Sequence, residues 1–490
     1  MFESILIANR GEIACRVERT ARALGLRTIA VFHHEDRNAP HVTMADEAHL
    51  LQADVPSAAY LDIEQIIGIA KAADAQCIHP GYGFLAENAA FAEAVEGARL
   101  TFVGPQAEVI RLMGDKIRSR EFAEKLGVPV APSVKQDGDL DAFVTAATQI
   151  GFPLLIKAAA GGGGKGMSIV RNAVEFAERA RIAAGEAERY FADGRIYAER
   201  YVERPRHIEV QVLGDGNGAV VHLFERECSV QRRFQKIIEE SPAAALDREL
   251  RDRICASAVD LAVSSKYRNA GTVEFILAPD GEFYFLEMNT RLQVEHPVTE
   301  IVCGVDLVEA QLRIAAGEGL PWQQADIGQS GHAIECRICC EEPENGFLPA
   351  TGTAQILRLP DEQSARFDGG IREGQAITAA FDSMVGKLVC KGKNREDAID
   401  ASLRALDELV LLGVSTNVDY LGAILQHPAF RAGQLHTGFV EEHASSLSPA
   451  PLDEIDSAAV LIAAALAVDE FHRLVYDTPE PYASMRDWRN

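Results

Sequence analysis

Five polar side chains at alternate positions could together bind a metal ion and a small anion. In the stretch FLEMNTRLQVEHPVTE they are Glu287, Asn289, Arg291, Gln293 and Glu295. Alternate side chains of an extended strand point to the same face, so we expect these groups to share one face. Carboxylate and amide oxygens bind hard divalent cations, and a guanidinium matches a planar oxyanion through two parallel hydrogen bonds. The row is either a reaction site or the solvated face of an ordinary half-exposed strand.

A hairpin is expected to bring a further carboxylate to this row. TVEFILAPDGEFYFLEMN has the pattern of two strands joined by Pro279, Asp280 and Gly281, residue types that form tight turns. Glu274 on the first strand would then lie close to Glu287 on the second. Because Mg²⁺ is commonly held by one or two carboxylates together with substrate phosphates, the hairpin predicts a divalent metal site.

A run of glycines in IKAAAGGGGKGMSIV, residues 156–170, is a second candidate for ligand binding. Gly161, Gly163 and Gly166 satisfy a dinucleotide fingerprint formally, but that motif opens a helix, and the residues after this loop are typical of a strand. A Walker loop needs Ser or Thr after its lysine, whereas Gly166 follows Lys165. A linker would be longer and polar on both flanks. The alternatives that remain are a hairpin tip that covers phosphate groups and a flexible hairpin without a role.

Length and composition predict a multidomain globular protein. A chain of 490 residues is too long for one core, and 47% hydrophobic with 25% charged residues is typical of globular domains. Forty-eight basic residues against 73 acidic ones give a net charge of -25, which disfavours nucleic acid as a partner. The N-terminus starts a strand without the segments of an export signal, so we expect the mature chain to begin at Met1. The longest apolar stretch, 458–468, is shorter than the ~20 residues of a membrane span, so we expect a packed amphipathic helix there.

The nine cysteines are scattered along the chain and predict a reducing cytoplasm as its location. Only CRICC, residues 336–340, resembles a metal-binding pair, and no second pair follows at zinc spacing. We therefore expect HAIECRICCEE to be a strand with Ile334, Cys336 and Ile338 on its inner face.

The elements that must position these groups fall into three regions. Residues 1–114 alternate strands and helices, as in a doubly wound parallel sheet, although the first turn, NRGEIA, is not a dinucleotide fingerprint. From about 115 to 330 the pattern is strands with hairpin turns and a few helices. After 331 we expect a third region, with a helix in NREDAIDASLRALDELVLLG whose core stripe is Ile399, Leu403, Leu406 and Val410. Residues 444–454 have the composition of a polar linker, followed by a helical tail.

Long motifs in sequence order resemble those of the biotin carboxylases, an ATP-grasp family. They are ANRGEIA, HPGYGFLAEN, MGDK, GGGGKGM, RHIEVQV, RECSVQRRFQK, TVEFI, FLEMNTRLQVEHPVTE, ECRI and DSMVGKL, and they span about residues 1–446. The resemblance implies an α/β and α+β multidomain fold. Its parts are a Rossmann-like N-terminal domain (1–114), an ATP-grasp domain (115–330) with a mobile glycine-rich lid (about 131–202), a C-terminal domain (331–446), and a linker with a helical tail (447–490).

The activity implied by the resemblance is ATP-dependent carboxylation of biotin with bicarbonate through carboxyphosphate, the first half-reaction of a biotin-dependent acyl-CoA carboxylase. It implies MgATP with two Mg²⁺ or Mn²⁺ ions, biotin on a carrier protein or domain, and bicarbonate as substrate. A carboxyltransferase subunit is the implied partner, in a homodimer or a larger complex. No AMKM-type biotinylation sequence occurs, so the carrier is expected on another chain or on a part of the protein absent here.

The resemblance also assigns roles to single residues. Glu295 would be the general base on bicarbonate, Lys236 would hold carboxyphosphate, and Arg337 would stabilise the biotin ureido oxygen. Bicarbonate would bind to Arg291, Gln293 and the backbone of Val294. The implied metal ligands are Glu274, Glu287 and Asn289. The implied nucleotide-binding residues are Lys116, Lys157, Gly163, Gly164, Lys165, Gly166, Glu199, Arg200, Tyr201, Val202, His207, Gln231, Phe234 and Ile276.

Two positions depart from the family pattern. Phe234 stands where a histidine is usual beside the nucleotide sugar, and Ser168 replaces a common arginine at the base of the lid. Phenylalanine cannot donate a hydrogen bond, so ATP affinity or nucleotide selectivity is in question. These departures motivate one alternative, a catalytically inactive regulatory subunit; an ATP-grasp ligase that joins a carboxylate to an amine is the other.

Some single residues have simpler alternatives as well. Arg337 could pair with Glu335 or Glu341 on its own strand. Glu87 could be a helix cap, a structural ion-pair partner or a site residue. Lys116 could be an ordinary lysine in the first turn of a helix, and Tyr82 a packing residue or a biotin contact.

Overall fold

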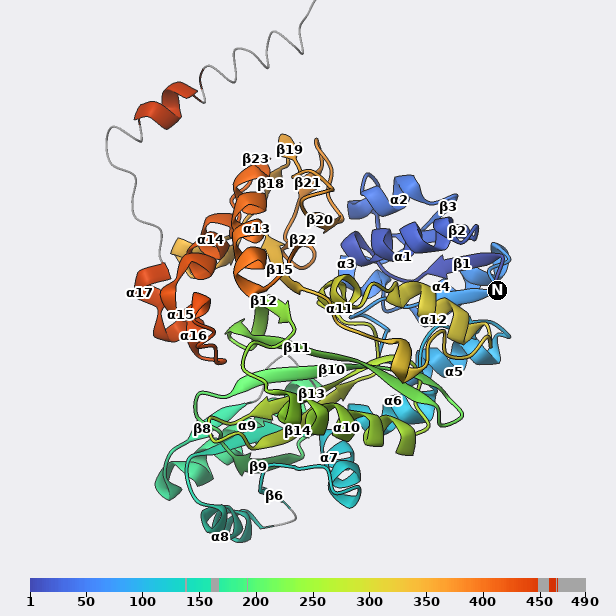
Figure 1. Ribbon diagram of the computed structural model, residues 1–490. Coiled ribbons are helices and arrows are strands. Elements are labelled where there is room, and N and C mark those ends of the chain that lie inside the picture. Colours follow the sequence, from blue (N-terminus) through green and yellow to red (C-terminus); the bar gives the residue numbers. More distant parts are fainter. Residues whose placement is uncertain (137–138, 160–166, 192, 448–457, 464, 466–490) are drawn as a thin grey trace, which may run out of the picture. The chain divides into compact units, whose positions relative to one another are not determined.

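A computed structural model describes residues 1–136, 139–159, 167–191, 193–447, 458–463 and 465 (Figure 1). Residues 1–447 form one unit and residues 448–490 a second. The elements discussed below all belong to the first unit unless stated otherwise. The domain boundaries given above stay a prediction.

A parallel sheet opens the chain, as the alternation of strands and helices predicted. Its order is β3-β2-β1-β4-β5, with bounds β1 Ser4–Ile7, β2 Arg27–Phe32, β3 Glu47–Leu50, β4 Cys77–His79 and β5 Thr101–Phe102. Parallel neighbours require crossovers, which the helices α1 (Gly11–Ala23), α4 (Ile63–Ala72) and α5 (Ala89–Gly97) supply. Strand β3, EAHL, was not predicted because it has no apolar pattern.

Two buried histidines make this region sensitive to acid. His41, in α2 (Pro40–Met44), is fully buried, and neither of its ring nitrogens has a hydrogen-bond partner among the described residues. Burial lowers the pKa of His41 to about 4, and it does the same for His79 at the end of β4. The unfolded chain therefore binds more protons than the folded chain between pH 6.5 and 4, so stability falls as pH falls through this window.

We expect each histidine to cost roughly 2 kcal/mol of stability at pH 5 relative to pH 7. Chemical denaturation of His41→Leu at both pH values should show a smaller loss than in the parent. An equal loss in parent and variant would contradict this account of His41.

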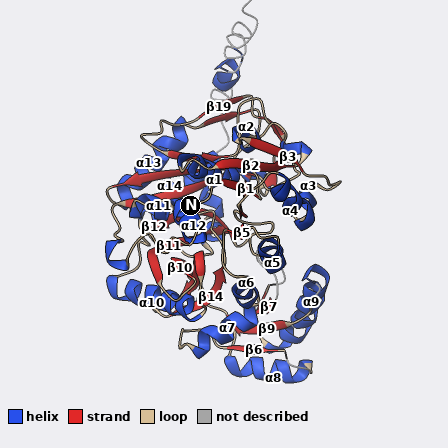
Figure 2. Ribbon diagram, turned by 90° about the vertical axis from the view of Figure 1, so that its right-hand side faces the viewer, coloured by secondary structure: helices blue, strands red, loops and turns tan. Residues whose placement is uncertain are grey.

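A small four-stranded sheet carries the glycine run. Its order is β6-β9-β7-β8, with bounds β6 Ser133–Lys135, β7 Leu154–Ala158, β8 Ser168–Val170 and β9 Ile196–Arg200. Figure 2 shows helices α8 (Leu140–Ile150) and α9 (Ala173–Phe191) beside this sheet. Strands β7 and β8 pair antiparallel, so the predicted order of strand, glycines and strand is confirmed. The glycines themselves lie outside the described residues, and their role as a phosphate lid stays a prediction.

An eight-stranded sheet forms the centre of the unit. Its order is β14-β13-β10-β11-β12-β15-β22-β20, with bounds β10 Arg206–Asp215, β11 Val220–Arg232, β12 Gln235–Ser241, β13 Arg268–Leu277, β14 Phe283–Asn289, β15 His332–Cys339, β20 Arg366–Gly369 and β22 Met384–Gly392. Strand β12 pairs with β15, so the predicted boundary at 330/331 falls between strands of one continuous sheet. This pairing places β12 and β15 side by side.

The predicted hairpin is confirmed, but the long polar strand is not. Strands β13 and β14 pair antiparallel, with Glu274 opposite Glu287. Strand β14 ends at Asn289, and the chain continues irregularly to helix α11 (His296–Cys303), which has a proline in its first turn. The expectation that all five groups share one strand face was therefore wrong beyond Asn289.

The third region confirms one expected strand and shortens one expected helix. In β15 the side chains of Ile334, Cys336 and Ile338 are buried in a hydrophobic core, as predicted for HAIECRICCEE. Helix α13 spans Arg395–Glu408, and Val410 instead begins strand β23 (Val410–Leu412). The predicted helical stripe was wrong at that residue.

Further helices and strands complete the unit. The helices are α3 Pro56–Ala59, α6 Ala107–Gly114, α7 Lys116–Lys125, α10 Arg248–Ser264, α12 Leu307–Ala315, α14 Val418–Gln426, α15 Pro428–Arg431, α16 Phe439–Glu442 and α17 Ala444–Leu447. The strands are β16 Glu341–Glu342, β17 Leu348–Pro349, β18 Gly352–Thr353, β19 Ile356–Arg358 and β21 Ala376–Ile377. Because α17 is helical, the predicted linker does not begin at residue 444.

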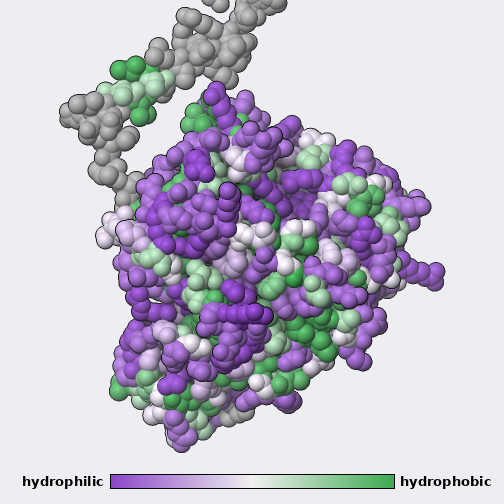
Figure 3. Space-filling model, viewed as in Figure 1, coloured by the Kyte–Doolittle hydropathy of each residue, from purple (hydrophilic) through white to green (hydrophobic). Residues whose placement is uncertain are grey.

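The described part of the tail is helical, as expected. Residues 458–463 form helix. The expected packing of this helix stays a prediction. Within the described chain, no helix has the length and apolar character needed to cross a bilayer. The face of the molecule seen in Figure 3 is mostly hydrophilic, in line with the charged composition.

Candidate active site

One cavity of about 620 Å³ collects the predicted site residues. Every catalytic, nucleotide-binding, bicarbonate-binding or metal-ligating residue predicted in the described chain lines it. Four further predicted residues, Gly163, Gly164, Lys165 and Gly166, lie outside the described residues. A cavity of this size is typical of a site for a nucleotide-sized ligand.

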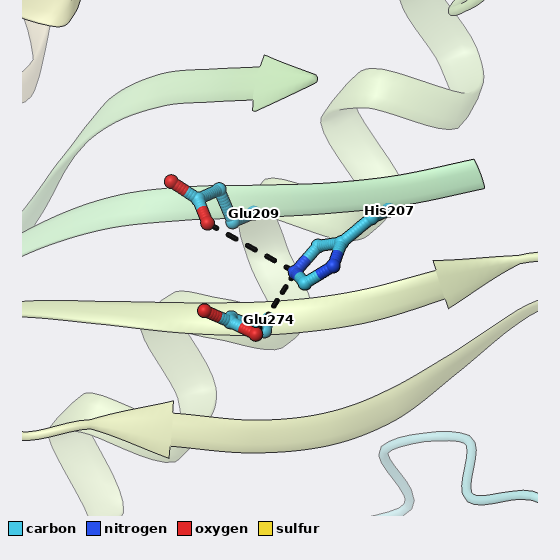
Figure 4. A group of neighbouring side chains, drawn as sticks. All are labelled: His207, Glu209 and Glu274. Atoms are coloured by element: carbon cyan, nitrogen blue, oxygen red, sulfur yellow. Dashed lines mark ion pairs between the residues drawn. The ribbon is translucent and has the colours of Figure 1, made fainter. Parts of the chain in front are cut away.

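Strand alternation explains why the polar groups face this cavity. In RHIEVQV the apolar residues Ile208, Val210 and Val212 pack into a hydrophobic core, so the alternate residues His207 and Glu209 point to the other face of β10. Strand β13 places Glu274 directly opposite Glu209. Figure 4 shows His207 and Glu209 on one strand with Glu274 on its neighbour.

The carboxylate of Glu274 is the centre of the polar network. Its Oε1 accepts hydrogen bonds from Lys236 Nζ (3.0 Å), Asn289 Nδ2 (2.8 Å) and Gln293 Nε2 (2.7 Å), and its Oε2 lies 2.9 Å from His207 Nε2. Burial acts to raise the pKa of Glu274, but the charges of Lys236 and His207 outweigh it and hold that pKa well below its usual value. Glu274 is therefore ionised at neutral pH.

The hairpin supplies the oxygen ligands that a divalent ion needs. Glu274 and Glu287 are cross-strand partners, and Asn289 follows on the same face of β14. Two carboxylates and an amide oxygen fit Mg²⁺, which prefers hard oxygen ligands. Glu287 lies 3.2 Å from Lys116 Nζ and raises the pKa of that lysine. A lysine at the first position of α7 opposes the helix dipole, and its pairing with Glu287 offsets that cost.

Beyond the end of β14, side-chain contacts rather than strand geometry position Arg291, Gln293 and Glu295. Arg291 donates from Nε to Glu87 Oε2 (2.8 Å) and from Nη2 to Asn289 Oδ1 (2.9 Å). Glu87 Oε1 also accepts a hydrogen bond from the backbone N–H of Thr290 (3.0 Å). Glu87 is thus an ion-pair partner, which was one of the predicted alternatives. It holds the segment that carries Arg291.

We expect Glu87→Gln to weaken this support without unfolding the protein. Glu87 is partly exposed, so the stability change should stay below about 1 kcal/mol. The apparent bicarbonate affinity should fall severalfold because Arg291 loses its charged partner, and the apparent MgATP affinity should not change. Steady-state ATP hydrolysis at varied bicarbonate measures both, and unchanged bicarbonate affinity would show that Glu87 does not position Arg291.

Glu295 lies between two cations at the start of α11. Its Oε1 accepts a hydrogen bond from Lys236 Nζ (2.5 Å) and its Oε2 one from Arg337 Nη2 (3.0 Å). Burial acts to raise the pKa of Glu295, but Lys236, Arg337 and Arg226 outweigh it and lower that pKa. The carboxylate is therefore ionised and able to accept a proton.

Arg337 forms its ion pairs with Glu239 and Glu295, not with Glu335 or Glu341 as its simpler alternative supposed. Its Nη2 lies 2.5 Å from Glu239 Oε1, on the adjacent strand β12, as well as near Glu295. Burial raises the pKa of Glu239 to about 7, against the lowering effect of Arg337. The pairing of β12 with β15 thus brings together cations from the second and third regions.

The opposite end of the cavity carries the groups predicted to bind nucleotide. Lys157 Nζ and Arg120 Nη1 lie 2.5 and 2.8 Å from the carboxylate of Glu199. Phe234 is 52% exposed at the β11–β12 turn, where Arg233 and Phe234 both have positive φ, 50° and 66°. Two consecutive non-glycine residues in this conformation are costly, so the turn places an aromatic ring at the cavity against local preference.

Several residues that hold the site were not predicted. They are Arg120, Glu209, Arg226, Glu239 and Lys387, whose Nζ donates to the backbone oxygen of Val294 (2.7 Å). Glu209 shares a face with His207 by alternation, and that pattern could have identified it. Arg226, Glu239 and Lys387 depend on cross-strand register, and Arg120 depends on the contact of helix α7 with Glu199 of β9. The sequence carries no direct signal for either.

Models of three protein domain families match consecutive parts of the chain. "Biotin carboxylase, N-terminal domain" matches residues 1–110, "Carbamoyl-phosphate synthase L chain, ATP binding domain" matches 115–323, and "Biotin carboxylase C-terminal domain" matches 335–442. Biotin carboxylase 2 of Bacillus subtilis is 47% identical over 90% of this chain and 100% of its own. The chain belongs to the biotin carboxylase family. The expected ATP-grasp enzyme class, with its mixed α/β multidomain fold, is thereby confirmed.

Two further relatives of this biotin carboxylase family member bear on its chemistry. The biotin carboxylase domain dimer of Hydrogenobacter thermophilus 2-oxoglutarate carboxylase, solved with MgADP, ADP and bicarbonate, is 44% identical with a TM-score of 0.89, over 92% of this chain and 100% of that one. The alpha subunit of the mitochondrial methylcrotonoyl-CoA carboxylase of Dictyostelium discoideum is 43% identical over 99% of this chain and 70% of its own.

Proposed function

We propose that this chain carboxylates carrier-bound biotin with MgATP and bicarbonate, as the first half-reaction of a biotin-dependent acyl-CoA carboxylase. One observation carries the proposal: the carboxylate of Glu295 contacts both Lys236 and Arg337 in the same cavity as Arg291 and Gln293. A base, an anion clamp and two further cations are the groups that activation of bicarbonate and transfer of its carbon require.

The acyl-CoA context is supported by the relative from Dictyostelium, whose similarity covers nearly the whole of this chain. The proposed partners are a second copy of this chain, a biotin carrier protein or domain, and a carboxyltransferase subunit. All nine cysteines are free thiols, which supports the proposed cytoplasmic location.

At the nucleotide end, Lys116 and Lys157 are proposed to bind phosphate oxygens, and Glu199 to Val202 together with His207 to hold the remainder of the nucleotide. Glu274, Glu287 and Asn289 are proposed to hold Mg²⁺, which neutralises charge that develops on the phosphates. Their present partners Lys116 and Lys236 are cations that phosphate oxygens can draw away. Nucleotide binding would then free these oxygens for the metal.

At the bicarbonate end, Arg291, Gln293 and the backbone of Val294 are proposed to orient the anion for reaction. Glu295 takes its proton, and the resulting oxyanion attacks the γ-phosphorus of ATP, which releases ADP and forms carboxyphosphate. Lys236 neutralises this intermediate. When Lys236 moves to the phosphate oxygens of bound ATP, it leaves Glu295. The pKa of Glu295 then rises, and the carboxylate becomes a stronger base.

The carboxyl transfer is proposed to depend on Arg337. Carboxyphosphate breaks down to CO₂ and phosphate beside the ureido ring, and phosphate accepts the N1′ proton. The guanidinium of Arg337 stabilises the negative charge on the ureido oxygen, as the donors of an oxyanion hole do.

ATP hydrolysis with and without bicarbonate and free biotin tests the proposal. We expect turnover to require bicarbonate and to increase with biotin. Turnover that needs no bicarbonate would favour the ligase alternative. No MgATP binding or turnover under any condition would favour the inactive regulatory protein.

A further inference from the structure

A fully buried guanidinium lies behind the bicarbonate end of the cavity without lining it. Arg226, on β11, has no exposed surface and is not among the cavity-lining residues. Desolvation of a lone cation is costly, so a buried arginine must be paired and hydrogen-bonded throughout. Its register partner across the sheet is Glu209, the residue drawn beside His207 in Figure 4.

All three nitrogens of this guanidinium have acceptors. Nε donates to Glu209 Oε1 (2.6 Å), Nη1 donates to Gln211 Oε1 (2.8 Å) and Thr299 Oγ1 (3.0 Å), and Nη2 donates to Thr272 Oγ1 (3.2 Å) and Gln293 Oε1 (2.9 Å). These partners come from β10, β13, α11 and the irregular segment after β14. Arg226 therefore joins that segment, which no strand holds, to the central sheet.

The contact with Gln293 has a chemical consequence. A guanidinium can only donate hydrogen bonds, so the amide of Gln293 must turn its oxygen toward Arg226. The Nε2 end then faces the cavity, where it donates to Glu274 Oε1 (2.7 Å). With the amide reversed, Gln293 would present an acceptor to the cavity, which repels an anion.

We propose that Arg226 is a positioning residue that makes Gln293 a hydrogen-bond donor toward the substrate anion. Arg226 touches no substrate; it acts through the orientation of the Gln293 amide. This inference rests on the proposed use of bicarbonate at that end of the cavity.

The test compares Arg226→Lys with Arg251→Lys in steady-state ATP hydrolysis at varied bicarbonate and varied MgATP. Lysine keeps the charge but lacks the planar fork that reaches both Glu209 and Gln293. Arg226→Lys should raise the KM for bicarbonate about tenfold or more and leave the KM for MgATP within about twofold. Arg251 pairs with Glu225 and does not line the cavity, so Arg251→Lys should change neither value. Equal changes in both KM values for Arg226→Lys, or no change in a folded variant, would overturn the inference.

A double-mutant cycle tests whether Arg226 acts through Gln293. In a Gln293→Ala background, Arg226→Lys should raise the KM for bicarbonate no further. Full additivity of the two changes would overturn the inference.

If Arg226→Lys does not fold, Gln293→Glu tests whether Gln293 must donate a hydrogen bond to the anion. Its carboxylate still accepts from Arg226 but has no N–H for the anion, so it should bind bicarbonate more weakly than Gln293→Ala. Affinity equal to the parent's would overturn the inference. A parent enzyme without bicarbonate-dependent turnover would instead refute the proposed function itself.

Discussion

Glu295→Gln should lower carboxylation of biotin by about 10²- to 10⁴-fold, the range for loss of a general base. Glutamine fills the same space and still accepts a hydrogen bond from Lys236 or Arg337, but it cannot take the bicarbonate proton at neutral pH. Equilibrium binding of MgATP should change little, because the groups proposed for the nucleotide lie elsewhere in the cavity. Labelled bicarbonate transferred to free biotin, together with MgATP binding, measures both effects.

The matched control for this change is Glu225→Gln. Glu225 is also a buried carboxylate of the central sheet, paired with Arg251 at 2.9 Å, but it does not line the cavity. This variant should lose about 1–3 kcal/mol of stability, since a buried ion pair is broken, and keep its turnover. If Glu295→Gln retained a parent-like rate, Glu295 would not be the base.

Arg337→Gln should slow carboxylation of biotin without slowing the bicarbonate-dependent hydrolysis of ATP to the same extent. We expect carboxylation of biotin to fall about 10²- to 10³-fold, the usual cost of removing one stabilising donor for a developing oxyanion. Glu295 keeps Lys236 as a partner, so slow bicarbonate-dependent hydrolysis of ATP without biotin should persist within a few fold of the parent. ADP release measured with and without biotin distinguishes these steps.

Arg395→Gln is the control for loss of a buried pair. Arg395 lies 2.7 Å from Glu240, the strand neighbour of Glu239, and is absent from the cavity lining. Arg395→Gln should destabilise the protein without changing the ratio between biotin carboxylation and biotin-independent ATP hydrolysis. If Arg337→Gln lowered both rates equally, a role confined to the biotin step would be excluded.

Turn chemistry predicted one part of the site, since a clear turn brings Glu274 opposite Glu287. RHIEVQV entered only through the motif resemblance, although in the structure its alternation separates a core face from a ligand face. Motif resemblance added Lys236 and Arg337, which local pattern alone would not have connected. The structure brings both of them within 3.0 Å of Glu295.

The failed predictions are places where tertiary contacts override local periodicity. The alternation from Glu287 to Glu295 suggested one strand, but β14 ends at Asn289. The residues that follow are held by hydrogen bonds that Glu87 accepts and Arg226 donates. Val410 follows a helical stripe yet pairs in a strand with Arg358. The shared sheet formed by β12 and β15 could not be deduced, because no local signal specifies which strands pair across a predicted domain boundary.

The most direct test of the central claim is transfer of labelled carbon from bicarbonate to free biotin by the parent and by the double variant Arg291→Ala/Glu295→Ala. We expect MgATP-dependent labelling by the parent and labelling at least about 10²-fold lower in the folded double variant. Labelling by the double variant at the parent's rate would contradict the claim that the anion clamp and the base at this end of the cavity activate bicarbonate.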